Sequence, residues 1–80
     1  MVLGIEKILI NNKFYEIEND INALKYAKSD DITTQFIINY HPIDKYWEVS
    51  FPLTDTFNYK TKFTDYNKMI NYSLQRISEM

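Results

Sequence analysis

Few side chains of the types used in catalysis stand near one another in this sequence. His41 is the only histidine, and there is no cysteine that could share a metal site with it. Because His41 directly precedes Pro42, we interpret it as a turn residue rather than a metal ligand. The serines stand in ordinary loop, strand and helix contexts with no candidate base beside them, namely Ser29, Ser50, Ser73 and Ser78. We therefore expect that the chain is not an enzyme.

Composition excludes several further kinds of site. The single glycine, Gly4, cannot build a glycine-rich loop that binds phosphate. The absence of cysteine excludes disulfides, iron–sulfur clusters and thiolate zinc sites, and it is typical of a reducing cytoplasm. No apolar run approaches the ~20 residues that a membrane-spanning helix needs. We expect a cytoplasmic protein with no cofactor, no metal and no membrane partner.

Residues suited to binding are more common. Aromatic side chains make up 16% of the chain, with seven tyrosines, which is more than so small a core needs. Tyr and Trp are enriched in protein interfaces, although an AT-rich coding sequence would also raise the content of Tyr, Ile and Asn. Acidic residues recur at every second position from residue 16 to residue 20, a spacing typical of a solvated strand. The candidate partner-binding residues are Tyr15, Glu16, Glu18, Asp20, Tyr46 and Glu48.

The first part of the chain is expected to form a hairpin and a helix. The apolar stretches 5–10 and 13–17 flank two asparagines, which tolerate the positive φ angles of a two-residue hairpin turn. A short helix, capped by Asn19 or Asp20, would follow and end near Lys28.

The second part of the chain has a clearer periodicity. Residues 32–40, 46–53 and 57–63 alternate apolar and polar side chains, which predicts three strands. Their short connections favour an antiparallel meander. Apolar residues at helical spacing then predict a helix from residue 64 or 65 to about residue 79.

These elements predict a single α+β domain over residues 1–80 with the order ββαβββα. One face of the antiparallel sheet would be covered by the C-terminal helix, and the pattern leaves open which face that is. The expected core consists of Phe36, Ile38, Trp47, Val49, Phe51, Phe57, Ile70, Leu74 and Ile77.

Two segments resemble families that bind nucleic acid. Residues 19–79 resemble the double-stranded RNA-binding domain in their expected α-β-β-β-α order, although residues 64–68 (TDYNK) lack the lysine-rich cluster of that family. Residues 46–52 (YWEVSFP) are similar to a strand of HicB-type antitoxins, without the glycine-rich turn that follows it there. These resemblances imply a nucleic-acid-binding regulator.

Residues 31–38 (DITTQFII) and 46–50 (YWEVS) resemble the central hairpin of small phage-encoded anti-CRISPR proteins, in which a three-stranded sheet lies between helices. The resemblance implies an inhibitor of a CRISPR effector nuclease. A formal net charge of −2 is too small for strong mimicry of DNA by carboxylates.

Two functional hypotheses follow. The first is a non-enzymatic protein that binds and inhibits another protein, most concretely a phage or mobile-element inhibitor of a host defence nuclease such as a CRISPR effector. The alternative is a nucleic-acid-binding regulator, similar to a double-stranded RNA-binding domain or a HicB-type antitoxin. Its phosphate contacts would be Lys60, Lys62, Lys68 and Arg76.

The two hypotheses differ in the affinity that they predict for nucleic acid. At most about four phosphates could be neutralised by the basic residues of the alternative, so binding should be weak. We expect no binding to duplex or single-stranded oligonucleotides tighter than ~10 μM at ~150 mM salt. Fluorescence anisotropy measures this affinity. A nanomolar dissociation constant that is lost when Lys60 and Lys62 are changed to Glu would favour the regulator.

Overall fold

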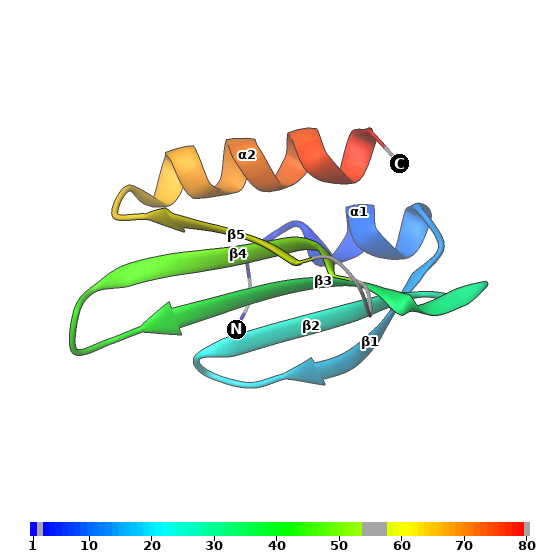
Figure 1. Cartoon of the computed structure of the whole chain (residues 1–80), viewed down its shortest axis with the longest axis horizontal. Helices are drawn as coiled ribbons and strands as arrows, with labels where there is room; N and C mark the ends of the chain where they lie inside the picture. Colours follow the sequence, from blue (N-terminus) through cyan, green and yellow to red (C-terminus); the bar gives the residue numbers. More distant parts are fainter. Residues whose placement is uncertain (2, 54–57, 80) are drawn as a thin grey trace.

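Five antiparallel strands form one sheet that carries two helices on the same face (Figure 1). The computed structural model describes residues 1, 3–53 and 58–79. The elements in chain order are α1 (Glu6–Asn11), β1 (Phe14–Asn19), β2 (Ala23–Lys28), β3 (Asp31–His41), β4 (Tyr46–Leu53), β5 (Asn58–Phe63) and α2 (Tyr66–Ser78).

The strands follow one another in space in the order β1-β2-β3-β4-β5, so β1 and β5 are the sheet edges. Each pair of neighbours is antiparallel. The β1–β2 turn, the β3–β4 turn and the β5–α2 connection therefore lie at one end of the sheet, and the β2–β3 turn lies at the other (Figure 1).

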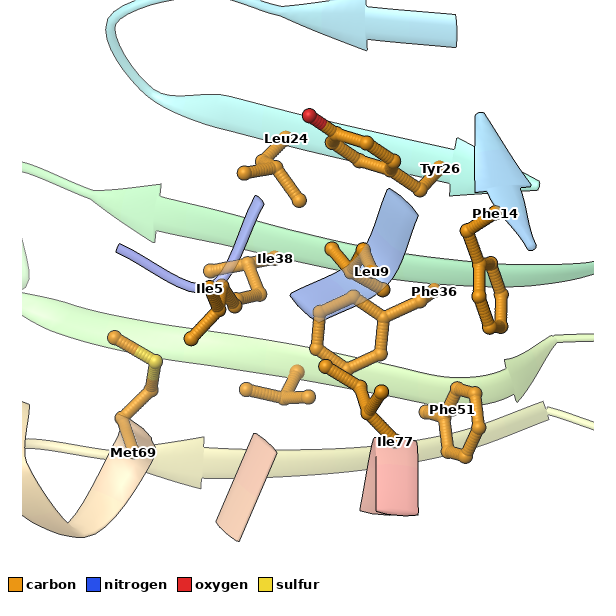
Figure 2. Close-up of a cluster of buried hydrophobic side chains, with 11 residues drawn as sticks. Ile5, Leu9, Phe14, Leu24, Tyr26, Phe36, Ile38, Phe51, Met69 and Ile77 are labelled. Carbon is orange, nitrogen blue, oxygen red and sulfur yellow. The ribbon is translucent and has the colours of Figure 1, made fainter. Parts of the chain in front are cut away.

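The core lies between the sheet and the two helices (Figure 2). Every second side chain of the central strands points to the helices, because side chains alternate between the two faces of a sheet. The register places Leu24 opposite Ile38, and Ile38 opposite Val49, on this face. The buried core residues are Ile5, Leu9, Phe14, Leu24, Tyr26, Phe36, Ile38, Val49, Phe51, Met69 and Ile77.

Helix α2 begins with a side-chain cap and continues with a buried stripe. The Asp65 carboxylate accepts a hydrogen bond from the Lys68 backbone N–H at 3.0 Å, which satisfies one of the free donors of the first turn. Met69, Ser73 and Ile77 follow at four-residue spacing and are fully buried. The buried Ser73 hydroxyl donates to the Met69 carbonyl at 2.8 Å, so it has a partner.

The α+β class, the antiparallel sheet and the covering C-terminal helix are confirmed. The three later strands and the last helix lie within one residue or two of their expected bounds, and residues 14–17 of the expected stretch 13–17 belong to β1. Five of the expected core residues, including Phe36 and Ile77, are buried, while Trp47, Ile70 and Leu74 are half-buried beside the core. Phe57 lies outside the described residues.

The expected strand over residues 5–10 is wrong, because these residues form helix α1 and the loop before it. Ile5 and Leu9 stand four residues apart and are both buried, whereas Ile8 and Ile10 are exposed. Helix α1 ends at Asn11. The positive φ that the expected turn would place at the two asparagines is found instead at Lys13, with a φ of 68°.

The expected helix over residues 20–28 is also wrong, because residues 23–28 form strand β2. Leu24 and Tyr26 lie directly opposite Ile38 and Phe36 of β3 and fill the core from there. The order is therefore αβββββα rather than ββαβββα. The α-β-β-β-α order that suggested a double-stranded RNA-binding domain over residues 19–79 is absent.

Ile77 and Leu74 offer a matched test of how α2 faces the sheet. Ile77 is fully buried and Leu74 only half-buried, so Ile77→Ala should lower the free energy of unfolding by about 2–5 kcal/mol and Leu74→Ala by less. Urea unfolding of both variants measures the difference. Equal losses, or a larger loss for Leu74→Ala, would mean that α2 presents another face to the sheet.

Candidate functional site

Aromatic side chains gather at the sheet end that contains the β1–β2 and β3–β4 turns. Two come from the end of β3, two from the start of β4 and one from the start of α2. We call this surface the aromatic end and define it by Tyr40, His41, Tyr46, Trp47 and Tyr66.

On the helix side of the sheet, three rings of the aromatic end are in contact. Tyr40 and Trp47 are cross-strand partners with ring centroids 4.5 Å apart. Trp47 also meets Tyr66 edge-on, with 5.7 Å between the centroids. Tyr40 and Trp47 are half-buried and Tyr66 is exposed, so the cluster has a side that faces solvent.

On the uncovered side of the sheet, His41 stacks on Tyr46. Their rings are 4.3 Å apart at the centroids and inclined by only 16°. The Lys62 ammonium lies 5.0 Å from the centroid of the Tyr46 ring, which is cation–π geometry. Among the described residues, His41 Nε2 is buried and has no hydrogen-bond partner.

Two isoleucines project from the turns at this end of the sheet. Ile21, in the β1–β2 turn, is 85% exposed, and Ile43, in the β3–β4 turn, is 92% exposed. The Asn22 carbonyl accepts a hydrogen bond from the Tyr40 N–H at 2.8 Å, which places the first turn against the aromatic end. Turn positions usually carry small or polar residues, so two isoleucines there are unusual.

The structure brings part of the proposed binding set to this region. Tyr46 belongs to the aromatic end, and Glu48 lies two residues further along the same face of β4, opposite Asn39 and Lys62. Asp20 lies in the β1–β2 turn, where its carboxylate accepts a hydrogen bond from the Asn22 N–H at 2.9 Å. These three residues therefore lie at or near one end of the sheet.

The other three candidates lie on β1, and they do not form one strip. A register shift between Glu16 and Glu18 turns their side chains to opposite faces of the sheet. Glu16 pairs with Tyr26 on the helix side, whereas Glu18 pairs with Lys25 on the uncovered side. Tyr15 is exposed near the start of β1, at the end of the sheet opposite the aromatic end.

The four basic residues of the alternative hypothesis lie on two sides of the molecule. Lys60 and Lys62 project from the uncovered face of the sheet, opposite Ser50 and Glu48. Lys68 and Arg76 belong to α2, which packs on the other face. They therefore do not form one continuous track for phosphates.

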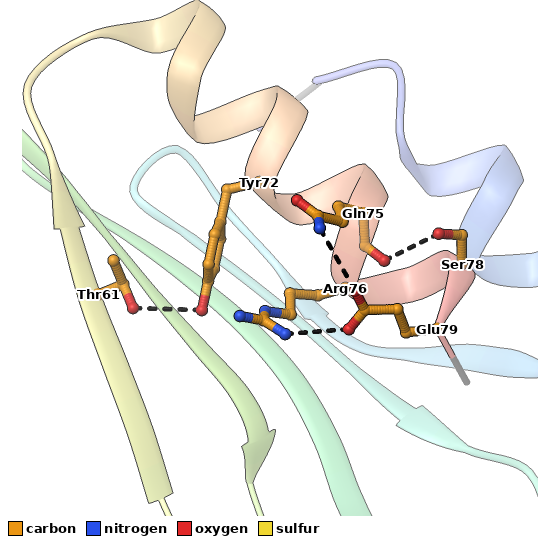
Figure 3. A network of polar contacts seen from close by, with 6 residues as sticks. All are labelled: Thr61, Tyr72, Gln75, Arg76, Ser78 and Glu79. Atoms are coloured by element: carbon orange, nitrogen blue, oxygen red, sulfur yellow. Dashed lines mark hydrogen bonds and ion pairs between the residues drawn. The ribbon is translucent and has the colours of Figure 1, made fainter.

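Arg76 already takes part in a polar network (Figure 3). Its guanidinium donates a hydrogen bond to Glu79 at 2.9 Å and lies 5.0 Å from the centroid of the Tyr72 ring. A hydrogen bond with Tyr72 and the nearby Glu79 carboxylate raise the pKa of Arg76 above its usual value. Tyr72 in turn accepts a hydrogen bond from the Thr61 hydroxyl at 3.2 Å, which ties α2 to β5.

The part of the chain that the structure describes holds no cluster of three or more His, Cys, Asp or Glu side chains that could bind a metal ion. Within the same residues, no helix is long and apolar enough to cross a membrane. Comparisons of this chain with protein-family models, curated proteins and solved structures found no match.

Sequence reasoning missed Ile21, Ile43, Tyr66 and the pairing of His41 with Tyr46 as parts of this surface. The signal for Ile43 was available, because a large apolar residue in the middle of a predicted turn has no core to enter. Ile21 falls within the helix that was expected to end near Lys28, which does not form.

Glu16 is exposed, and its carboxylate also contacts a residue of the core. The Tyr26 hydroxyl donates to Glu16 Oε1 at 3.4 Å, and the Tyr26 side chain is almost fully buried. Burial first, and then the negative charges of Glu16 and Glu6, raise the pKa of Tyr26 above its usual value.

The raised pKa of Tyr26 predicts a loss of stability in alkaline solution. As the pH rises above about 10, the unfolded chain loses the Tyr26 proton before the folded chain does, so the free energy of unfolding falls. Tyr26→Phe should remove this part of the alkaline loss, while the matched variant Tyr66→Phe should lose stability as the wild type does. Melting temperatures measured from pH 8 to pH 11 test this. Identical pH profiles for all three proteins would contradict it.

Proposed function

We propose that this chain is a non-enzymatic protein that binds another protein through its aromatic end. The observation that carries the proposal is the gathering of aromatic rings in contact at one sheet end, flanked by Ile21 and Ile43 at 85% and 92% exposure. Isolated exposed apolar residues are common on protein surfaces, but a contiguous group is typical of an interaction site.

The chemistry of this surface suits a protein partner. Tyr and Trp offer a large contact area at a small cost in side-chain entropy, and they are frequent at the energetic centres of interfaces. The rings here already pack against one another, so part of the ordering cost of binding is met before the partner arrives.

Charge favours a protein over a nucleic acid as the partner. Lys45 follows Asp44 in the chain, and Lys62 lies opposite Glu48 in the sheet. The region therefore holds both signs of charge. A surface that binds phosphates needs clustered basic residues.

In its most concrete form, the proposal is that the chain inhibits a host defence nuclease of the CRISPR type and acts in the cytoplasm of the host cell. The support is the resemblance of residues 31–38 and 46–50, which belong to the antiparallel β3–β4 hairpin. The arrangement around the hairpin differs from the three-stranded sheet between helices that the resemblance implied, since five strands carry both helices on one face.

Ile43→Asp tests the proposed surface. The purified chain should inhibit DNA cleavage by at least one member of a panel of CRISPR effector complexes, and Ile43→Asp should weaken that inhibition by about 30-fold, the loss typical of an interface hot spot. Ile32→Asp is the matched control, because Ile32 is 61% exposed at the start of β3, at the opposite end of the sheet.

Melting temperatures should confirm that both variants fold, since neither isoleucine belongs to the core. Inhibition of no effector in the panel would contradict the nuclease-inhibitor form of the proposal. An equal loss in both variants would contradict the assignment of the aromatic end. Capture of RNA or DNA from a host lysate, in place of one stoichiometric protein, would favour the regulator.

A further inference from the structure

The outer edge of β5 has the geometry and the charge to take up an additional strand. β5 is the last strand of the sheet, so one row of its backbone N–H and C=O groups faces away from β4. We infer that an extended acidic segment of the partner protein pairs with this edge. The inference rests on the proposed function and specifies the chemistry of the partner.

Two lysines define the charge of this edge. Lys60 and Lys62 are exposed and lie on the same face of β5, because they are two residues apart. Lys62 lies opposite Glu48, with its ammonium over the Tyr46 ring, and Lys60 lies opposite the neutral Ser50. Two carboxylates at alternate positions of an added strand would lie directly across from these lysines, an arrangement that favours strand pairing.

The same lysines disfavour pairing with a second copy of β5. In a symmetric antiparallel pair centred on Thr61, Lys60 of one copy would lie opposite Lys62 of the other, and like charges in that position are destabilising. The opposite edge, β1, carries Glu16 and Glu18. An acidic strand is therefore repelled at β1 and attracted at β5.

The helix side of the edge holds β5 in place. Thr61 points toward α2, and its hydroxyl bonds to that of Tyr72 at 3.2 Å (Figure 3). Phe63 is a cross-strand partner of Trp47 and packs on Tyr72, with 5.0 Å between the ring centroids. β5 is thus held from the helix side, and its last residues adjoin the aromatic end.

A labelled seven-residue peptide that alternates glutamate with valine is a direct probe. We expect it to bind the wild-type chain and to slow hydrogen exchange at backbone amides of β5, but not of β1. A peptide with lysine in place of glutamate should not bind. Exchange protection separates strand addition from simple attraction between charges, which would leave the amides unprotected.

Charge reversal locates the site. The double variant Lys60→Glu/Lys62→Glu should weaken binding of the glutamate peptide at least about tenfold, the change that 1.4 kcal/mol produces. The double variant Lys7→Glu/Lys13→Glu changes the net charge equally but alters α1 and the loop after it, so it should bind nearly as well as the wild type. Melting temperatures should show that both variants fold. If Lys60→Glu/Lys62→Glu does not fold, the variant Lys60→Gln/Lys62→Gln is used in its place.

Several results would overturn the inference. These are unprotected β5 amides, protection at β1 instead, an equal loss in both charge variants, or binding of the lysine peptide. Protection of β5 without peptide, with a molecular mass that grows with concentration, would assign the edge to a second copy.

Two further outcomes separate this inference from the proposed function. If the peptide does not bind but Ile43→Asp still weakens inhibition, the edge inference is wrong and the proposed function stands. If the peptide binds β5 but Ile43→Asp has no effect on inhibition, the aromatic end is the part that is wrong.

Discussion

Burial of one sheet face under two helices is the constraint on which the rest of this structure depends. A domain of 80 residues has a small core. Each fully buried aliphatic side chain in it adds about 1.5–3 kcal/mol to the free energy of unfolding. The short helix α1 supplies Ile5 and Leu9, and the longer α2 supplies Met69 and Ile77. Because both helices lie on the same face, the sheet can keep polar and charged side chains on its other face.

This one-sided arrangement leaves three kinds of surface for binding, which are the uncovered face, the two edges and the two ends. The aromatic end and the β5 edge meet at Lys62, whose ammonium lies over the Tyr46 ring. A partner strand beside β5 would therefore run toward the end of the sheet that holds Phe63 and the aromatic end. One protein could occupy both surfaces, with backbone pairing supplying affinity at the β5 edge and apolar contacts supplying it at the aromatic end.

The sequence alone determined the α+β class, the three later strands and the last helix. Their signals are local, since alternation over six or more residues and a helical stripe with a cap at Asp65 each specify one backbone conformation. The secondary structure of residues 6–11 and 23–28 was not determined by the sequence, because six residues can satisfy the periodicity of a helix or of a strand. Tertiary packing decided them: Leu24 and Tyr26 pair with β3 of the sheet, and this leaves α1 to cover the core above it.

The same division holds for the candidate site. Composition showed an excess of tyrosines, and the period-2 pattern placed Tyr46 and Glu48 on one face of a strand. Only the tertiary structure brought the β1–β2 turn, through Asn22, beside Tyr40 and separated Glu16 from Glu18. The reason is physical: which turns share a sheet end follows from the number and order of the strands, and which way a side chain points beyond a register shift depends on the neighbouring strand.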